Sequence, residues 1–130
     1  MAFSSSLVAQ RLGAVLGLLG VILGASGAHG PINIQLVANN SLDTWKTAVL
    51  YQFVHALALL AVGQQPVLRL GIVICWGIGV TMFSGSLYFL ALEPTQHWMG
   101  PVTPLGGVFL ILGWAWLLFN LSVGRKNSAD

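Results

Sequence analysis

The residues of this chain that could do chemistry are concentrated in an apolar stretch at residues 47–56. This stretch carries a phenol, an amide and an imidazole, at Tyr51, Gln52 and His55. On a helix, at about 100° per residue, Tyr51 and His55 lie about 40° apart and Gln52 lies at the edge of the same arc. Polar side chains inside a bilayer need polar partners. The spacing therefore predicts that this face is directed toward protein rather than toward lipid.

Further polar side chains are expected in the same half of the membrane. The predicted cluster consists of His29, Tyr51, Gln52, His55, Ser84, Ser86, Tyr88 and Thr103. A network of interhelical hydrogen bonds, each contributing about 0.6 kcal/mol, explains such a cluster. A cavity that binds a small ligand explains it too, and His55 is the intramembrane ionisable residue that would mark such a site. We favour the network and keep the ligand site as the alternative.

Catalytic and metal-binding patterns are missing from the sequence. No Gly-x-Ser-x-Gly motif occurs, and Ser84 and Ser86 have no evident acidic partner at the same depth. The histidines and carboxylates expected near the outer surface are not paired at short ligand spacing. Phosphate-binding loops and basic patches for nucleic acid are also missing. We therefore expect no enzymatic activity, no metal site and no nucleic-acid partner.

A haem held by two histidines is the remaining cofactor to consider. Its two ligand nitrogens must lie about 4 Å apart across the iron. His29 is expected at the outer edge, whereas His55 lies about a dozen residues inside its helix, a depth difference of roughly 18 Å. One chain cannot hold haem between them, although two copies of His55 in a dimer could. We expect no cofactor, and a haem- or quinone-associated redox subunit is the third functional alternative.

Composition places these residues in a membrane. Of 130 residues, 56% are hydrophobic and 6% are charged, whereas about 25% of a soluble domain is charged. Four apolar stretches are long enough to span a bilayer, at approximately 7–28, 42–62, 67–92 and 102–123. The uncharged segment 12–28 is too long for a usual signal peptide, so we expect an uncleaved first span. The prediction is a single-domain, all-α integral membrane bundle of four antiparallel helices.

The basic residues predict which way up the chain lies. Four of them fall at one end of the predicted helices and one at the other: Arg11, Arg69, Arg125 and Lys126 against Lys46. Because cytoplasmic segments are enriched in Lys and Arg, we expect both termini in the cytoplasm. The connection at residues 30–42, at the opposite end, is too short and polar to span. It fits either a helix lying on the surface or an irregular loop.

Glycines predict where the helices pack. In the first span they recur at spacings of 4, 3, 4 and 3, which draws one straight seam along the helix. Glycine on such a seam lets another backbone approach closely. The glycines expected in packing are Gly13, Gly17, Gly20, Gly24, Gly27, Gly85, Gly106 and Gly107. We expect this packing within the chain, and association of two copies stays open.

Four motifs in order along the chain resemble one family. They are GAHG at 27–30, HALALL at 55–60 after Trp45, FSGSLY at 83–88 and GPVTPLGG at 100–107. Together they are similar to the YgdD-like small inner-membrane proteins, known as domain of unknown function 423. The resemblance covers nearly the whole chain. It implies a four-helix protein of the bacterial inner (plasma) membrane, with membrane-bound eukaryotic relatives, and it implies no activity.

One segment departs from the family pattern. Residues 31–41 are apolar and rich in amides here, where relatives usually carry a charged segment. For function, the first hypothesis is a non-catalytic accessory or packing subunit that associates laterally with other membrane proteins or with itself. The second is a carrier or binder of a small polar or amphipathic molecule, using the polar cluster around His55.

Overall fold

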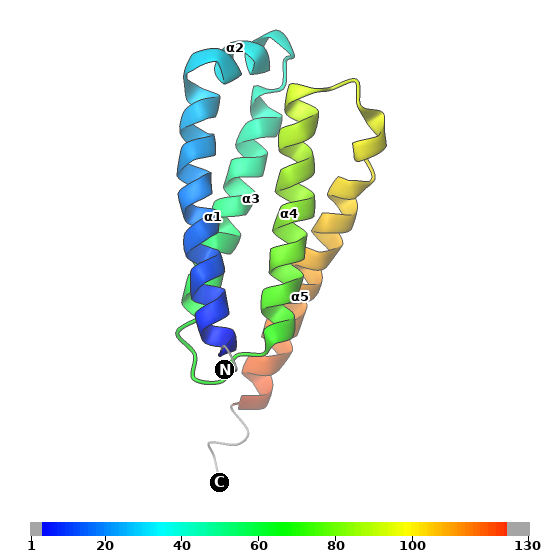
Figure 1. The fold of residues 1–130 in the computed structure, drawn as a ribbon. Helices are drawn as coiled ribbons and strands as arrows, with labels where there is room; N and C mark the ends of the chain where they lie inside the picture. The colour runs from blue at the N-terminus through cyan, green and yellow to red at the C-terminus, as the bar shows by residue number, and fades with distance from the viewer. Residues whose placement is uncertain (1–3, 125–130) are drawn as a thin grey trace.

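The structure, a computed structural model, describes residues 4–124, and in this range its regular elements are all helices. They are α1 (Ser5–Ala28), α2 (Gly30–Ala38), α3 (Leu42–Val62), α4 (Leu70–Leu92), the short 3₁₀ helix η1 (His97–Met99) and α5 (Val102–Gly124) (Figure 1). Four segments of this range are long and apolar enough to cross a membrane: α1, α3, α4 and residues 97–121. Arg125 and Lys126, used to predict the orientation, lie outside the described residues.

The bounds of the helices agree closely with the predicted spans. The main difference is at the start of α4, which begins at Leu70 rather than at residue 67. Arg69 has an extended backbone, with ψ of 120°. The preceding turn is held against α1, because Ser6 donates a hydrogen bond to the carbonyl of Gln65 (2.9 Å) and Gln10 to that of Gly63 (2.8 Å). Residues 67–69 are therefore used to carry the chain across to α4.

The connection at residues 30–42 contains the helix α2, which lies across one end of the molecule, opposite the end at which α1 begins and α5 ends (Figure 1). The chain turns into it at Gly30, whose φ of +77° is accessible to glycine with little strain. Leu36 is fully buried. Gln35, Asn39 and Ser41 donate hydrogen bonds to the carbonyls of Ala91 and Leu92, at the C-terminal end of α4, where no intrahelical donors are left. A helix, not an irregular loop, therefore caps this end.

The long helices follow one another as a row in the order α1, α3, α4, α5 (Figure 1). The largest contacts are α4 with α5, α1 with α3, and α3 with α4, so the second and third spans are neighbours as predicted. Helix α1 touches α4 only slightly, and within residues 4–124 it has no extensive contact with α5. The four helices therefore do not close into a ring.

Close packing of α1 on α3 depends on glycines spaced by seven. An added Cβ on Gly13 would lie 2.8 Å from the carbonyl oxygen of Ala56, and one on Gly20 would lie 2.9 Å from the ring of Phe53. An added Cβ on Gly27 would collide with the indole of Trp45. Gly24 is looser, because its nearest neighbour would be a Val49 methyl group at 3.6 Å.

Two of the predicted packing glycines do not take part in packing. A Cβ on Gly17 or Gly85 would meet no atom of the neighbouring helices within 4 Å, so neither glycine is needed for a close approach of those helices. At the start of α5, Gly106 does pack closely, since an added Cβ would collide with the backbone of Phe83 on α4. Gly107 is less crowded, at 3.7 Å from the ring of Phe83.

Candidate functional site

His55 lies in the interior of the row, 3% exposed, with both ring nitrogens in hydrogen bonds. The indole Nε1 of Trp114, on α5, donates to His55 Nε2 across 3.0 Å. An indole N–H can only donate, so Nε2 must be the acceptor. Nδ1 lies 2.7 Å from the carbonyl oxygen of Tyr51 and must then carry the proton. The contacts therefore assign one neutral tautomer to His55, with every ring polar atom used.

Two tryptophans complete the surroundings of this histidine, which we call the His55 cluster: His55 on α3, Trp76 on α4 and Trp114 on α5. The ring of Trp76 lies 5.9 Å from that of His55 and 4.7 Å from that of Trp114. Trp76 is fully buried, and its Nε1 has no hydrogen-bond partner among the described residues. Gly113 makes room for this indole, because an added Cβ would collide with it. The cluster thus joins three helices through one hydrogen bond and through edge-to-face and tilted contacts between the aromatic rings.

Gln52, also on α3, connects three helices with a single amide. Its Nε2 donates to the carbonyl of Leu16 on α1 (2.8 Å), and its Oε1 accepts from the hydroxyl of Tyr88 on α4 (2.8 Å). The ring of Tyr88 lies 4.7 Å from the indole of Trp45 in an edge-to-face arrangement. Trp45 in turn donates to the carbonyl of Leu23 on α1 (2.8 Å). The polar groups at this level are therefore used to hold α1, α3 and α4 together.

The two serines of α4 bond to different neighbours. Ser84 donates to the carbonyl of Ala48 on α3 (2.8 Å), and the hydroxyl of Ser86 lies 2.6 Å from that of Thr103 on α5. Both serine side chains are buried. Helix α4 is thus bonded on one side to α3 and on the other to α5.

Two members of the predicted cluster lie outside this network. His29 is exposed at the C-terminal end of α1, and in the described structure its backbone N–H, not its ring, makes a hydrogen bond, to the carbonyl of Ala25. Tyr51 is 41% exposed. Its ring packs at 4.5 Å on that of Phe83, but its hydroxyl has no hydrogen bond within residues 4–124. The ring of Tyr51 therefore packs on protein, as predicted, whereas its hydroxyl makes no hydrogen bond there.

This geometry limits the chemistry of the site. A metal ion or haem iron needs a free imidazole nitrogen, and so does general-base catalysis. At His55 a free nitrogen would require breaking the bond to Trp114 or the bond to the carbonyl of Tyr51. Gln52, Ser84 and Tyr88 are likewise engaged within the chain. What the arrangement does in the present conformation is fix the relative positions of four helices.

Sequence reasoning missed Trp114 and Trp76 as members of the site. A signal was present, because an indole N–H deep in an apolar span needs an acceptor and His55 is an available one. The acceptor carbonyls of Leu16, Leu23 and Ala48 carry no such signal, since every residue has one.

Comparisons of this chain with family models and with individual proteins point to the same family. The model of the family described as a protein of unknown function (DUF423) matches residues 23–107. A UPF0382 membrane protein of Schizosaccharomyces pombe is 37% identical over 117 residues, covering 83% of this chain and 96% of its own length. The UPF0382 membrane protein YwdK of Bacillus subtilis is 39% identical over 109 residues, covering 79% and 86%.

The name of a third relative states the membrane in which that protein is found. The UPF0382 inner membrane protein YgdD of Escherichia coli is 36% identical over 120 residues, covering 88% of this chain and 89% of its own length. No solved structure matches the chain.

Proposed function

Because the chain belongs to the DUF423 family, and the relatives described above are named as membrane proteins, we propose that it is a non-catalytic membrane module. It associates laterally with a transmembrane helix of another protein. The four spans are antiparallel, and both termini lie on the cytoplasmic side of an inner (plasma) membrane. The bias of basic residues supports this orientation, and the inner-membrane name of the Escherichia coli relative supports the location.

The single observation that carries the proposal is the exposure of Tyr51 inside the membrane. We expect the binding surface to be centred on this residue. Tyr51 is the tenth residue of α3, about 14 Å from the start of the helix at 1.5 Å per residue. That depth is close to the middle of a hydrocarbon core about 30 Å thick. The side chain is nevertheless 41% exposed, with its hydroxyl unbonded in the described part of the chain. A partly exposed tyrosine, with no hydrogen bond to its hydroxyl from residues 4–124, therefore lies at this depth on a face of the row.

An unbonded hydroxyl at this depth is costly. Moving such a group from water to a hydrocarbon without a hydrogen bond costs roughly 4–8 kcal/mol. A neighbouring helix that offers a carbonyl, hydroxyl or amide acceptor recovers part of this cost. The surrounding surface, formed by Tyr51, Val54 on the same helix and Trp114 on α5, is exposed and otherwise apolar. We call these three residues the Tyr51 surface.

Site-specific photocrosslinking in intact membranes tests this proposal. A benzophenone amino acid replaces Tyr51 in one variant and Leu57 in a control, because Leu57 lies on the same helix and is 64% exposed. We expect position 51 to form an adduct with one membrane protein, identified by mass spectrometry, and position 57 to crosslink to lipid. A tagged copy of that protein should then co-purify the native chain, and co-purification should fall with Tyr51→Leu.

Two outcomes would contradict the proposal. The first is crosslinking to lipid alone at both positions. The second is an adduct at position 51 that contains two copies of this chain, which would show self-association in place of an accessory role.

A further inference from the structure

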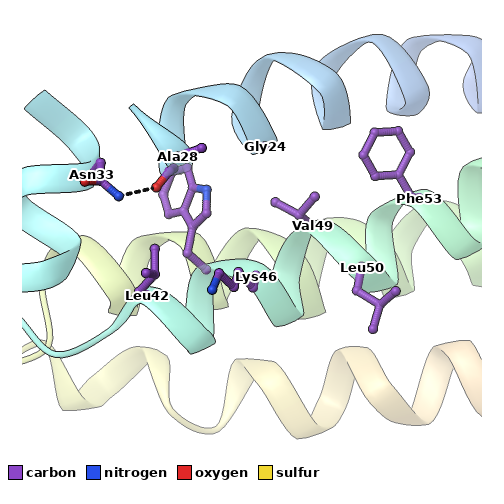
Figure 2. Close-up of a pocket in the computed structure, with 10 residues that line it drawn as sticks. Gly24, Ala28, Asn33, Leu42, Lys46, Val49, Leu50 and Phe53 are labelled. Carbon is purple, nitrogen blue, oxygen red and sulfur yellow. Dashed lines mark hydrogen bonds between the residues drawn. The ribbon is translucent and has the colours of Figure 1, made fainter. Parts of the chain in front are cut away.

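A second feature of the molecule is a groove between α1 and α3, near the end covered by α2, with a volume of about 580 Å³ (Figure 2). Its lining comes from α1, α2 and α3: Gly24, Gly27, Ala28, Asn33, Leu42, Trp45, Lys46, Val49, Leu50 and Phe53. On α1 the lining residues are glycines and an alanine, so this wall is backbone with almost no side chain. The volume lies in the range of about 300–1,000 Å³ that is typical of small-ligand sites.

The groove is apolar along its length, with one charged group at its rim. Val49 and Phe53 follow one another along α3, on the side directed toward α1 and Gly24, as Figure 2 shows. Asn33 is the other polar lining residue, but its amide is used, since it donates to the carbonyl of Gly27 across 2.8 Å. Lys46 is exposed and makes no ion pair with any described residue, including Asp43 one turn earlier. A single ammonium group is thus left available beside an apolar channel.

The dimensions of the groove match one leaflet of a bilayer. Its lining on α3 runs from Leu42 to Phe53, which at 1.5 Å per residue is about 16 Å. Half of a hydrocarbon core about 30 Å thick is about 15 Å. Lys46 lies one turn from the end of α3 that borders α2, where headgroups are expected. The apolar part then extends toward the middle of the membrane.

We propose that this groove binds an anionic phospholipid from the leaflet that contains α2. One acyl chain lies along Gly24, Val49 and Phe53, and the headgroup phosphate contacts the ammonium of Lys46. Charge complementarity selects the headgroup, because a lysine near the surface attracts anionic lipid. Room for the acyl chain against α1 is found at Gly24, where an added Cβ would meet only a methyl group of Val49 at 3.6 Å, whereas the space at Gly27 is filled by the indole of Trp45. This site shares no residue with the Tyr51 surface, so either proposal can fail without the other.

Native mass spectrometry of the full chain in a mild detergent tests the inference, with phosphatidylglycerol and phosphatidylcholine added as probes. In Lys46→Gln, we expect the preference for phosphatidylglycerol to fall about fivefold, as removal of one surface charge predicts. The matched control is Arg69→Gln, which removes the same charge at the opposite end of the row and should leave the preference unchanged.

A second pair of variants tests the apolar part. Gly24→Leu has room for its Cβ, which would lie 3.6 Å from Val49, and the rest of its side chain enters the groove. We expect this variant to lose the bound lipid while keeping the melting temperature of the native chain. Its control, Gly17→Leu, lies two turns away on α1 and points to open space, so it should keep the lipid.

Two results would overturn the inference. One is equal retention of phosphatidylglycerol and phosphatidylcholine by the native chain. The other is an unchanged phosphatidylglycerol adduct in both Lys46→Gln and Gly24→Leu, which would place the lipid elsewhere on the protein.

Discussion

Removing the indole donor of Trp114 should destabilise the helix row measurably. Trp114→Phe keeps an aromatic ring beside Trp76 but removes the hydrogen bond of 3.0 Å to His55 Nε2. In membranes an interhelical hydrogen bond contributes about 0.6 kcal/mol on average and about 1.7 kcal/mol at most. The variant also leaves a buried acceptor unpaired, and losses of this kind cost about 1–3 kcal/mol. We expect the free energy of unfolding to fall by about 1–3 kcal/mol.

Equilibrium unfolding in mixed micelles, with increasing fractions of a denaturing detergent and followed by circular dichroism, measures this loss. The matched control is Trp116→Phe, the same substitution two residues later on α5, about 200° further round the helix. The indole N–H of Trp116 has no hydrogen bond in the part of the chain described, so this control reports lost packing against Gly71 without a lost bond. The difference between the two variants estimates the contribution of the bond.

A double-mutant cycle with His55→Leu isolates the pair. Once the acceptor is gone, Trp114→Phe should cost only the lost ring area, so the two costs should not add. We expect a coupling energy of about 0.6–1.7 kcal/mol. The reasoning is refuted if Trp114→Phe costs the same in both backgrounds, because His55 and Trp114 would then not depend on each other for stability.

Three further predictions concern Gln52, the glycines of α1 and the orientation of the chain in the membrane. Gln52→Leu removes the hydrogen bonds to α1 and α4 and should lower the free energy of unfolding by about 1–3 kcal/mol. Tyr88→Phe removes only the bond to α4 and should lower the free energy of unfolding less. Equal losses in the two variants would contradict this prediction. Gly13→Ala should be destabilising because its Cβ meets the carbonyl of Ala56, and Gly17→Ala should be neutral or stabilising by up to about 1 kcal/mol; the melting temperatures of both report it. In a cysteine-free background, Asn40→Cys should react with an impermeant thiol reagent added outside intact cells, and a cysteine near the N-terminus only after lysis; the reverse pattern would invert the proposed orientation.

The positions of the long helices could be predicted from the sequence because a bilayer imposes strict demands on it. A segment that crosses hydrocarbon must be apolar over about 20 residues and must satisfy its own backbone hydrogen bonds. These two conditions predict a span at approximately 42–62, and α3 runs over Leu42–Val62. No such condition applies to residues 30–42. There the helix α2 depends on burial of Leu36 and on bonds from Asn39 to the end of α4, which are tertiary contacts.

The candidate site could be predicted in part for the same reason. Polar residues within a span must face protein, which places Gln52 and His55 in the interior, and both are buried. Their partners could not be deduced, since Gln52 bonds to the backbone of Leu16 and a backbone carbonyl is the same in every residue. Helical geometry puts Tyr51 about 40° from His55. Periodicity does not give the rotation of α3 against α4, and that rotation leaves Tyr51 partly exposed on a face of the row.

Because the four helices form a row that does not close into a ring, Gln52 and His55 have a specific structural role. Helices in a row pack mainly on their immediate neighbours, so each end helix, α1 or α5, is held mainly by the one helix beside it. Both residues lie on α3, and their hydrogen bonds reach outward in opposite directions. Gln52 joins α1 to α4 through one amide, and His55 joins α3 to α5, a pair with little other contact.

Loss of either residue should therefore change the position of an end helix before it unfolds the core around Trp76. A change in the position of α5 would move Trp114 within the Tyr51 surface. The internal polar network and the proposed binding surface are coupled in this way, because the indole of Trp114 both bonds to His55 and is exposed on the Tyr51 surface.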